Sequence, residues 1–255
     1  MLWVFCGSLM TPNGAGQTQL DSLLGSLSDT PLNNAVLYQL ESQPPDARIL
    51  PALRAAFESH GDKREKQAIA ATLIRLGEKS DRYFEFLASF VRQAVQDRTP
   101  MFYKRGGRRG EFSPEFENWC ALNHKDPNEV RVIQAYVEPM DVQALAQAQD
   151  QRADGLFREG LESPNAYVVA FCVEGLARIG DESAIPLISK AAERLGGGQL
   201  IAGGLPWYSS VEAERLFERL VPDQATRDYL RRQVVTMRSM ESQRAARRAG
   251  GGIPK

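Results

Sequence analysis

Apolar residues recur along this chain at intervals of three and four positions, the spacing that places them on one face of an α-helix. No segment alternates apolar and polar residues for the length of a strand. The pattern therefore predicts an all-α fold. The predicted apolar stripes are Leu20, Leu23, Leu24 and Leu27; Val36, Leu37 and Leu40; Leu50, Leu53 and Phe57; Ile69, Leu73 and Leu76; Phe84, Leu87, Val91 and Val95; Val130, Ile133 and Val137; Val169, Cys172, Leu176 and Ile179; Ile185, Ile188, Ala192 and Leu195; Ala213, Leu216, Phe217 and Leu220; Leu230, Val234 and Met237.

The stripes are separated by residues that commonly begin and end helices. Asp46 and Asp181 stand where a helix N-terminus favours a hydrogen-bond acceptor and a negative charge. Gly77 and Gly180 directly follow the last apolar residue of a stripe, where glycine commonly ends a helix in the left-handed conformation. We therefore expect short helices joined by tight turns.

Two parts of the chain contain the same short sequence motifs. One helix ends in Leu73-Ile74-Arg75-Leu76-Gly77, and a later one ends in Leu176-Ala177-Arg178-Ile179-Gly180. The helices paired with them open as Asp46-x-x-Ile49-Leu50-Pro51 and Asp181-x-x-Ala184-Ile185-Pro186. A helix pair of this length cannot bury its own apolar face, so repeated pairs must stack on one another.

These motifs resemble those of HEAT repeats. The resemblance covers residues 46–97 and 152–195 and extends in weaker form to 17–43. It implies a right-handed α-solenoid of antiparallel helix pairs. It also implies a concave face that binds another macromolecule.

The stripes and the loops between them divide the chain into segments. The two interruptions of the array are rich in glycine and aromatic residues, and loops of such length in a compact array are uncommon. The predicted segments are a leader (1–16), N-terminal repeats (17–97), a basic and aromatic insertion with a short helix (98–127), HEAT-like repeats (128–195), a Gly-rich aromatic loop (196–209), C-terminal capping helices (210–240) and a disordered basic tail (241–255).

The composition is that of an ordinary globular protein, with 43% apolar and 25% charged residues in 255. The net charge of −1 gives no strong overall attraction to nucleic acid or to an anionic membrane. Charge is unevenly distributed, because residues from 231 onward carry seven cations against the single carboxylate of Glu241. The slightly negative net charge of the whole chain argues against nucleic acid as the partner.

The N-terminal leader has three interpretations. Leu2–Met10 is an uncharged apolar run, and Gly14-Ala15-Gly16 follows it, as in a secretory signal that is cut after Gly16. No Lys or Arg precedes Arg48, so a signal would need a start codon farther upstream. An exported protein, periplasmic or secreted, follows from that interpretation. An apolar capping element or a disordered leader would instead leave the protein cytoplasmic. The run is too short to span a bilayer, and we expect no transmembrane segment.

Cysteines and histidines give no sign of a metal site. Cys120 and Cys172 lie in apolar helical stretches, which predicts two buried thiols. His60 and His124 lie in turns, where we expect surface histidines with satisfied hydrogen bonds. HEAT-like iron hydroxylases hold two metals with His-Glu dipeptides, and this chain has none. We expect no metal and no cofactor.

Motifs for catalysis are also missing from the sequence. It contains no GxSxG, Ser-x-x-Lys, GxxxxGK[ST] or GxGxxG. Its clustered carboxylates have the spacing of solvated helix faces, and we predict a protein that is not an enzyme. The clusters are Glu111, Glu115 and Glu117, and Glu212, Glu214 and Glu218.

Two loops carry candidate binding residues. The first places four cations beside two aromatic residues and three glycines, which suits base stacking and phosphate contact; alternatively it is a solvated, mobile excursion. The second contains Trp207 and Tyr208, which either anchor a partner or fold back onto the apolar core. The candidates in the first loop are Phe102, Tyr103, Lys104, Arg105, Arg108 and Arg109.

Three functions are compatible with the resemblance. The favoured one is a non-enzymatic HEAT-like scaffold that binds a protein partner, whose identity the sequence does not reveal. Some DNA glycosylases are HEAT-like, which implies a concave basic groove and a catalytic Asp, whereas this chain places its cations in a loop and a tail. Phycobilin lyases and their chaperones also carry HEAT-like repeats, although no residues here indicate a chromophore pocket.

Overall fold

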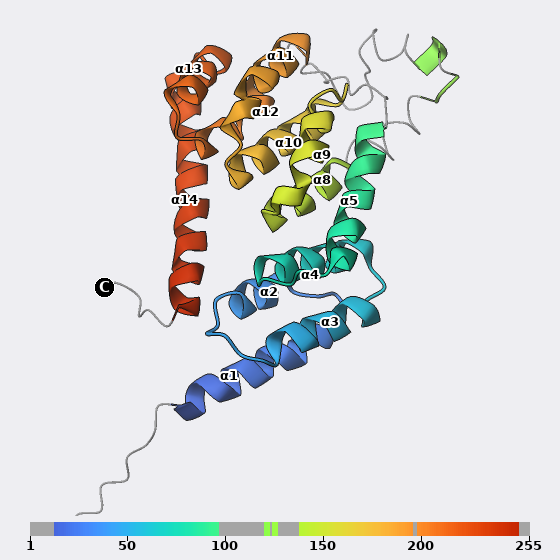
Figure 1. Ribbon diagram of the computed structural model, residues 1–255, viewed down its shortest axis with the longest axis vertical. Coiled ribbons are helices and arrows are strands. Elements are labelled where there is room, and N and C mark those ends of the chain that lie inside the picture. Colours follow the sequence, from blue (N-terminus) through green and yellow to red (C-terminus); the bar gives the residue numbers. More distant parts are fainter. Residues whose placement is uncertain (1–12, 97–119, 123, 127–137, 196–197, 250–255) are drawn as a thin grey trace, which may run out of the picture.

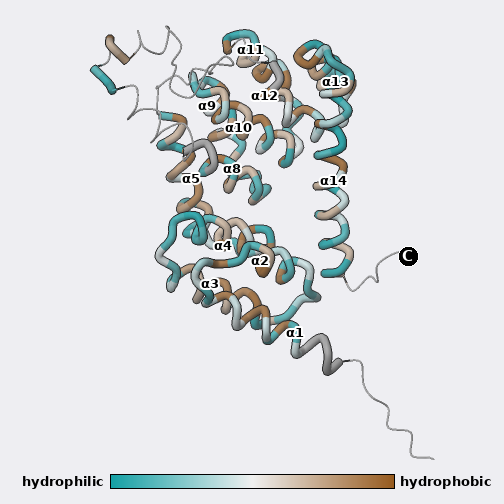
Figure 2. The backbone as a smooth tube through the Cα atoms, turned by 180° about the vertical axis from the view of Figure 1, so that it is seen from behind, coloured by the Kyte–Doolittle hydropathy of each residue, from teal (hydrophilic) through white to brown (hydrophobic). Residues whose placement is uncertain are grey.

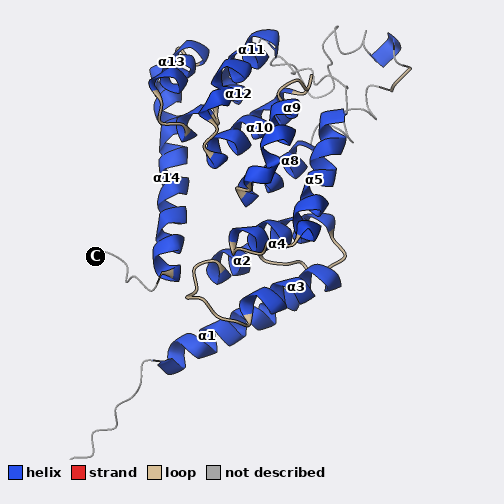
Figure 3. Cartoon of the chain, in the orientation of Figure 1, coloured by secondary structure: helices blue, strands red, loops and turns tan. Residues whose placement is uncertain are grey.

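A computed structural model describes residues 13–96, 120–122, 124–126, 138–195 and 198–249. Every regular element in these ranges is helical (Figure 3), which confirms the predicted all-α class. The α-helices are α1 (Asn13–Gly25), α2 (Asn34–Leu40), α3 (Ile49–Ser59), α4 (Lys63–Arg75), α5 (Asp81–Gln96), α8 (Glu138–Ala148), α9 (Asp154–Gly160), α10 (Ala166–Ile179), α11 (Ile185–Leu195), α12 (Gly198–Ala202), α13 (Val211–Leu220) and α14 (Gln224–Arg248). Short 3-10 helices lie at η1 (Ser26–Ser28), η2 (Gln151–Ala153), η3 (Glu182–Ala184) and η4 (Leu205–Trp207).

Local sequence explains where several helices begin and end. Gly77 and Gly180 adopt the left-handed conformation, with φ of 92° and 80°, as predicted. Asp181 caps η3, because its side chain accepts the backbone N–H of Ser183. Asp46 does not cap α3, because the helix begins only at Ile49. The Asp46 side chain instead accepts the backbone N–H of Arg48, the residue before α3. Side chains that cap α2, α4, α10, α13 and α14 are Asn33, Asp62, Asn165, Ser210 and Asp223.

The helices extend from α1 at one end of the molecule to α11 and α13 at the other (Figure 1). We call α1 to α13 the array. Helix α4 packs against α3 and α5, α8 packs against α4, α5 and α10, and α10 packs against α9 and α12. All residues of the predicted stripes that fall in the described ranges are buried or half-buried, and they form one continuous core. The stripe at 130–137 lies outside those ranges.

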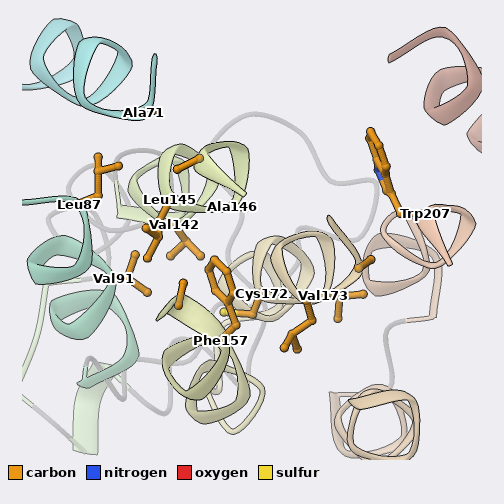
Figure 4. Close-up of a cluster of buried hydrophobic side chains, with 14 of the residues drawn as sticks. Ala71, Leu87, Val91, Val142, Leu145, Ala146, Phe157, Cys172, Val173 and Trp207 are labelled. Carbon is orange, nitrogen blue, oxygen red and sulfur yellow. The ribbon is translucent and has the colours of Figure 1, made fainter. Parts of the chain in front are cut away.

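The centre of the core lies where α5, α8, α9 and α10 meet. Figure 4 shows Leu87 and Val91 of α5 facing Leu145 of α8, with Phe157 of α9 beside Cys172 of α10. Cys172 and Cys120 are buried and form no disulfide, as predicted, and burial raises the pKa of the Cys172 thiol strongly.

Glycines allow α9 and α10 to approach closely. A methyl group on Gly175 would lie 2.5 Å from the Phe157 ring, and one on Gly160 would lie 2.3 Å from the Cys172 sulfur. At these two positions the helices therefore pack with no room for a further carbon atom.

Helix α14 leaves the array and runs back along its side (Figure 1). Its 25 residues make it about 37 Å long. Polar residues predominate along it (Figure 2), and Val234 is its one buried residue. The disorder predicted from residue 241 is wrong as far as Arg248, where the helix ends. Glu241 and Arg244 hold this part of the helix through ion pairs to the array, and its Gln, Ala and Arg residues favour a helix.

Two further predicted segments contain helical residues. The Gly-rich loop at 196–209 contains α12 and η4, so much of it is ordered. Helix α1 begins at Asn13, and the predicted cut after Gly16 would fall inside it. Across the described ranges, no helix combines the length and the apolar character that crossing a bilayer requires.

Candidate functional site

The structure separates the predicted binding residues into two groups. Phe102, Tyr103, Lys104, Arg105, Arg108 and Arg109 lie outside the described residues. Trp207 and Tyr208, at the end of η4, are each only 8% exposed and belong to the core. The alternative prediction, that these two rings fold back onto the core, is confirmed. They are too buried to anchor a partner.

A cleft of about 930 Å³ lies between α14 and one edge of the array. We call it the α14 cleft. Its array wall is formed by the end of α2, the C-terminal ends of α4, α8 and α10, and η2. Its other wall is the part of α14 from Met237 to Arg248. The cleft is thus bounded by a row of helix ends on one side and by a single long helix on the other.

Each copy of the repeated sequence motif places one arginine in this row of helix ends. Arg75 ends α4 and Arg178 lies in the last turn of α10, and both line the α14 cleft. A cation in the last turn is favourable there because the carbonyl end of a helix is partially negative. The shared Leu-x-Arg-[Leu/Ile]-Gly phrase therefore places equivalent charges along one edge of the array.

Glu41 joins three helices at one end of the cleft. Its side chain is only 3% exposed. One carboxylate oxygen accepts Arg75 Nε–H at 2.9 Å and the Thr72 hydroxyl at 2.9 Å, and a second Arg75 nitrogen also contacts it. The other oxygen accepts Arg244 Nη1–H of α14 at 3.0 Å. A buried carboxylate is therefore neutralised by one cation from the array and one from α14.

Arg178 makes the second connection to α14. Its side chain is 4% exposed, and it donates to Glu174 at 2.8 Å and to Glu241 of α14 at 2.6 Å. Its guanidinium lies 4.0 Å from the centre of the Trp207 ring, a favourable cation–π distance. Arg238 of α14 donates to the Trp207 carbonyl oxygen. The buried Trp207 thus supports the charged groups of the cleft.

Two further contacts bring the C-terminal half of α14 onto the array. The Arg244 guanidinium lies 4.5 Å from the centre of the Tyr38 ring. Arg248 Nη1–H donates to the Arg75 carbonyl oxygen at 3.3 Å, at the C-terminal end of α4. Polar contacts therefore hold this half of the helix in place, while no side chain beyond Val234 in the described part of α14 is fully buried.

His60 lies far from the cleft, in the turn at the opposite end of α4, and its predicted surface position is wrong. The residue is 5% exposed. Its Nδ1 lies 2.6 Å from a Glu65 oxygen and its Nε2 lies 2.7 Å from the Leu27 carbonyl oxygen. Two acceptors favour the doubly protonated ring. The Leu27 carbonyl, and to a lesser extent the Glu65 carboxylate, therefore raise the pKa of His60. Glu65 also accepts the Leu32 N–H at 2.7 Å, and the group fixes the chain between α1 and α2.

In the part of the chain that the structure describes, no group of three or more His, Cys, Asp or Glu side chains is arranged so that it could hold a metal ion. His124 is in a turn with a φ of 53°. No family model, curated protein or solved structure matches the chain. The resemblance to HEAT repeats thus stays an expectation from sequence.

Proposed function

We propose that this protein is a non-enzymatic, HEAT-like repeat scaffold that binds a segment of another protein in the α14 cleft. The observation that carries the proposal is the cleft itself, about 930 Å³ in volume and bounded by the repeated helix ends and α14. Binding sites occur preferentially in such concave places between helices.

The equivalent positions of Arg75 and Arg178 support the repeat architecture. Each lies at the end of a helix in the array, occupies the same position in the repeated sequence motif and lines the same cleft. We infer that α3 and α4 form one HEAT-like unit, that α9 and α10 belong to a second, and that the units form a right-handed solenoid. Such a stack leaves an elongated edge free for recognition.

The state of the charged groups favours binding over catalysis. A general base or nucleophile must present a free polar atom to its substrate. Glu41 is nearly fully buried and both of its oxygens are engaged, and Glu241 is paired with Arg178. These carboxylates hold α14 in place, which is a structural role.

The size and lining of the cleft suit a short extended peptide. The lining part of α14, Met237–Arg248, is about 17 Å long, which matches about five residues of an extended chain. The cleft offers the apolar surfaces of Tyr38, Ile74, Met237 and Met240 between its charged groups. Methionine side chains adapt to irregular partner surfaces. A peptide can therefore place apolar side chains on this surface.

The proposal is tested by filling the cleft. Ala245 lines it, whereas its exposed neighbour Ala246 does not. Partners are recovered with tagged wild-type protein, Ala245→Trp and Ala246→Trp from the native cells, and each is quantified by mass spectrometry. We expect at least one partner to be lost from Ala245→Trp and kept by Ala246→Trp. Equal recovery of every partner by both variants would contradict the proposal.

A further inference from the structure

The carboxylates of the α14 cleft are already neutralised by the protein itself. Glu41 is paired with Arg75 and Arg244, and Glu241 with Arg178. The other two lining carboxylates are engaged in the same way: Glu78 by Arg54, and Asp150 by Arg152. A basic ligand would have to break these pairs before it could bind a carboxylate here.

Two cations of the same cleft are not neutralised. Lys79 is exposed, and its ammonium group forms no ion pair within the described ranges. Arg248 is half-buried and uses one N–H on the Arg75 carbonyl oxygen at 3.3 Å, while its other donors have no described partner. The cleft lining holds six cationic and four anionic side chains, so the formal charge of its side chains is +2, although the whole chain carries −1.

Apolar surface lies among these charges. Tyr38 and Met240 are 44% and 48% exposed, and both line the cleft. The guanidinium of Arg244 lies over the Tyr38 ring and fixes its position. Apolar side chains that reach this surface would gain by burial.

From this arrangement we propose that the α14 cleft selects an acidic protein segment. Carboxylates of the segment pair with Lys79 and Arg248, and its apolar side chains cover Tyr38 and Met240. The inference deepens the proposed function and rests on it. Nucleic acid fits less well, because tight binding to a phosphate backbone uses many cations and the cleft offers two free ones beside four carboxylates.

The test uses the full-length protein and a displayed library of random 12-residue peptides. Enriched peptides are synthesised, and their affinities for the wild type are measured by fluorescence anisotropy. We expect enrichment of Asp and Glu together with apolar residues. The charge-reversed variant Lys79→Glu/Arg248→Glu should bind these peptides about tenfold more weakly or worse. Lys79→Glu alone should weaken binding in the same direction and leaves α14 untouched.

A matched variant controls for net charge. Lys190 and Arg247 are exposed and do not line the cleft, so Lys190→Glu/Arg247→Glu makes the same change in charge elsewhere. It should bind the acidic peptides as the wild type does. Equal loss in both double variants would overturn the inference, since it would show an effect of overall charge.

The other outcomes separate the inference from the proposed function. Enrichment of basic or uncharged peptides that Ala245→Trp no longer binds would overturn the acidic selectivity and leave peptide binding intact. Failure to enrich any peptide whose binding depends on Ala245 would overturn both. Tighter binding of a 12-nucleotide oligo(dT) than of the enriched peptides, lost in Lys79→Glu/Arg248→Glu, would assign the cleft to nucleic acid and also overturn the inference.

Discussion

Replacing Glu41 by Gln removes the negative charge that connects α2, α4 and α14. In the native protein one oxygen of Glu41 accepts from Arg75 and Thr72, and the other accepts from Arg244. A Gln side chain keeps a single acceptor oxygen, and its NH₂ group would face a guanidinium, donor against donor. The variant therefore leaves two cations without a carboxylate in a largely buried place.

The cost follows from the exposure of the three groups. Breaking a buried ion pair by removal of one partner costs about 3–5 kcal/mol. Arg75 and Arg244 are 18% and 17% exposed, so water reaches them in part, and Arg75 keeps its bond to the Gln147 carbonyl oxygen at 3.0 Å. We therefore expect Glu41→Gln to lower the free energy of unfolding by about 2–3 kcal/mol. Ordinary domains have a stability of about 5–15 kcal/mol, so the variant should still fold.

Two measurements test this expectation. Urea denaturation gives the change in stability, and hydrogen exchange read by mass spectrometry reports on residues 240–248, which should exchange faster once the Arg244 contact is weakened. Arg244→Gln is the control: it removes one contact to Glu41 and should cost about 1–2 kcal/mol. The two changes should be less than additive in the double variant because they remove a shared interaction. A loss below about 0.5 kcal/mol for Glu41→Gln, with unchanged exchange at 240–248, would refute the reasoning.

Two predictions concern the core. Leu27 and then Glu65 raise the pKa of His60, so its stabilisation is complete below about 6.5 and is lost as pH rises through the raised native pKa. The urea midpoint of the wild type should fall across that window relative to His60→Gln; parallel profiles would contradict it. Gly175→Ala brings a methyl group 2.5 Å from the Phe157 ring and should cost about 1–3 kcal/mol in thermal unfolding. Gly155→Ala meets open space in α9 and should be neutral or stabilising; equal losses would contradict the packing argument.

The helices and their buried faces could be predicted because they depend on local spacing. The stripe of Leu53 and Phe57 is buried, and so is that of Leu87 and Val91. Gly77 and Gly180 end their helices as expected, because the left-handed conformation is a property of the residue itself. Periodicity does not state which helices pack together, so the position of α14 could not be read from it.

The cleft was missed because its contacts join distant parts of the chain. Arg244 and Glu41 are 203 positions apart, and Arg178 and Glu241 are 63 apart. One signal lies in the sequence, where the predicted capping helices (210–240) meet the predicted disordered tail (241–255). Five of the seven residues of α14 that line the cleft recur at helical spacing, although most of the five are polar: Met237, Glu241, Arg244, Ala245 and Arg248.

Trp207 and Tyr208 show the limit of composition as a guide to binding. Glycine and proline near an aromatic pair suggested a recognition loop, but the chain folds here into η4 and buries both rings. A Trp gains more by covering the core and supporting Arg178 than by facing solvent. Sequence alone left both interpretations open.

The central claim is that a partner segment lies in the α14 cleft. A photo-reactive amino acid at Met240, which lines the cleft, tests it most directly, with the same residue at Val235 as the control. Both positions are exposed on α14, at 48% and 64%, and Val235 lies outside the cleft. We predict that Met240 crosslinks to one short acidic segment of a partner protein, mapped by mass spectrometry, and that Val235 does not. Crosslinking of the same segment from both positions, or from Val235 alone, would contradict the claim.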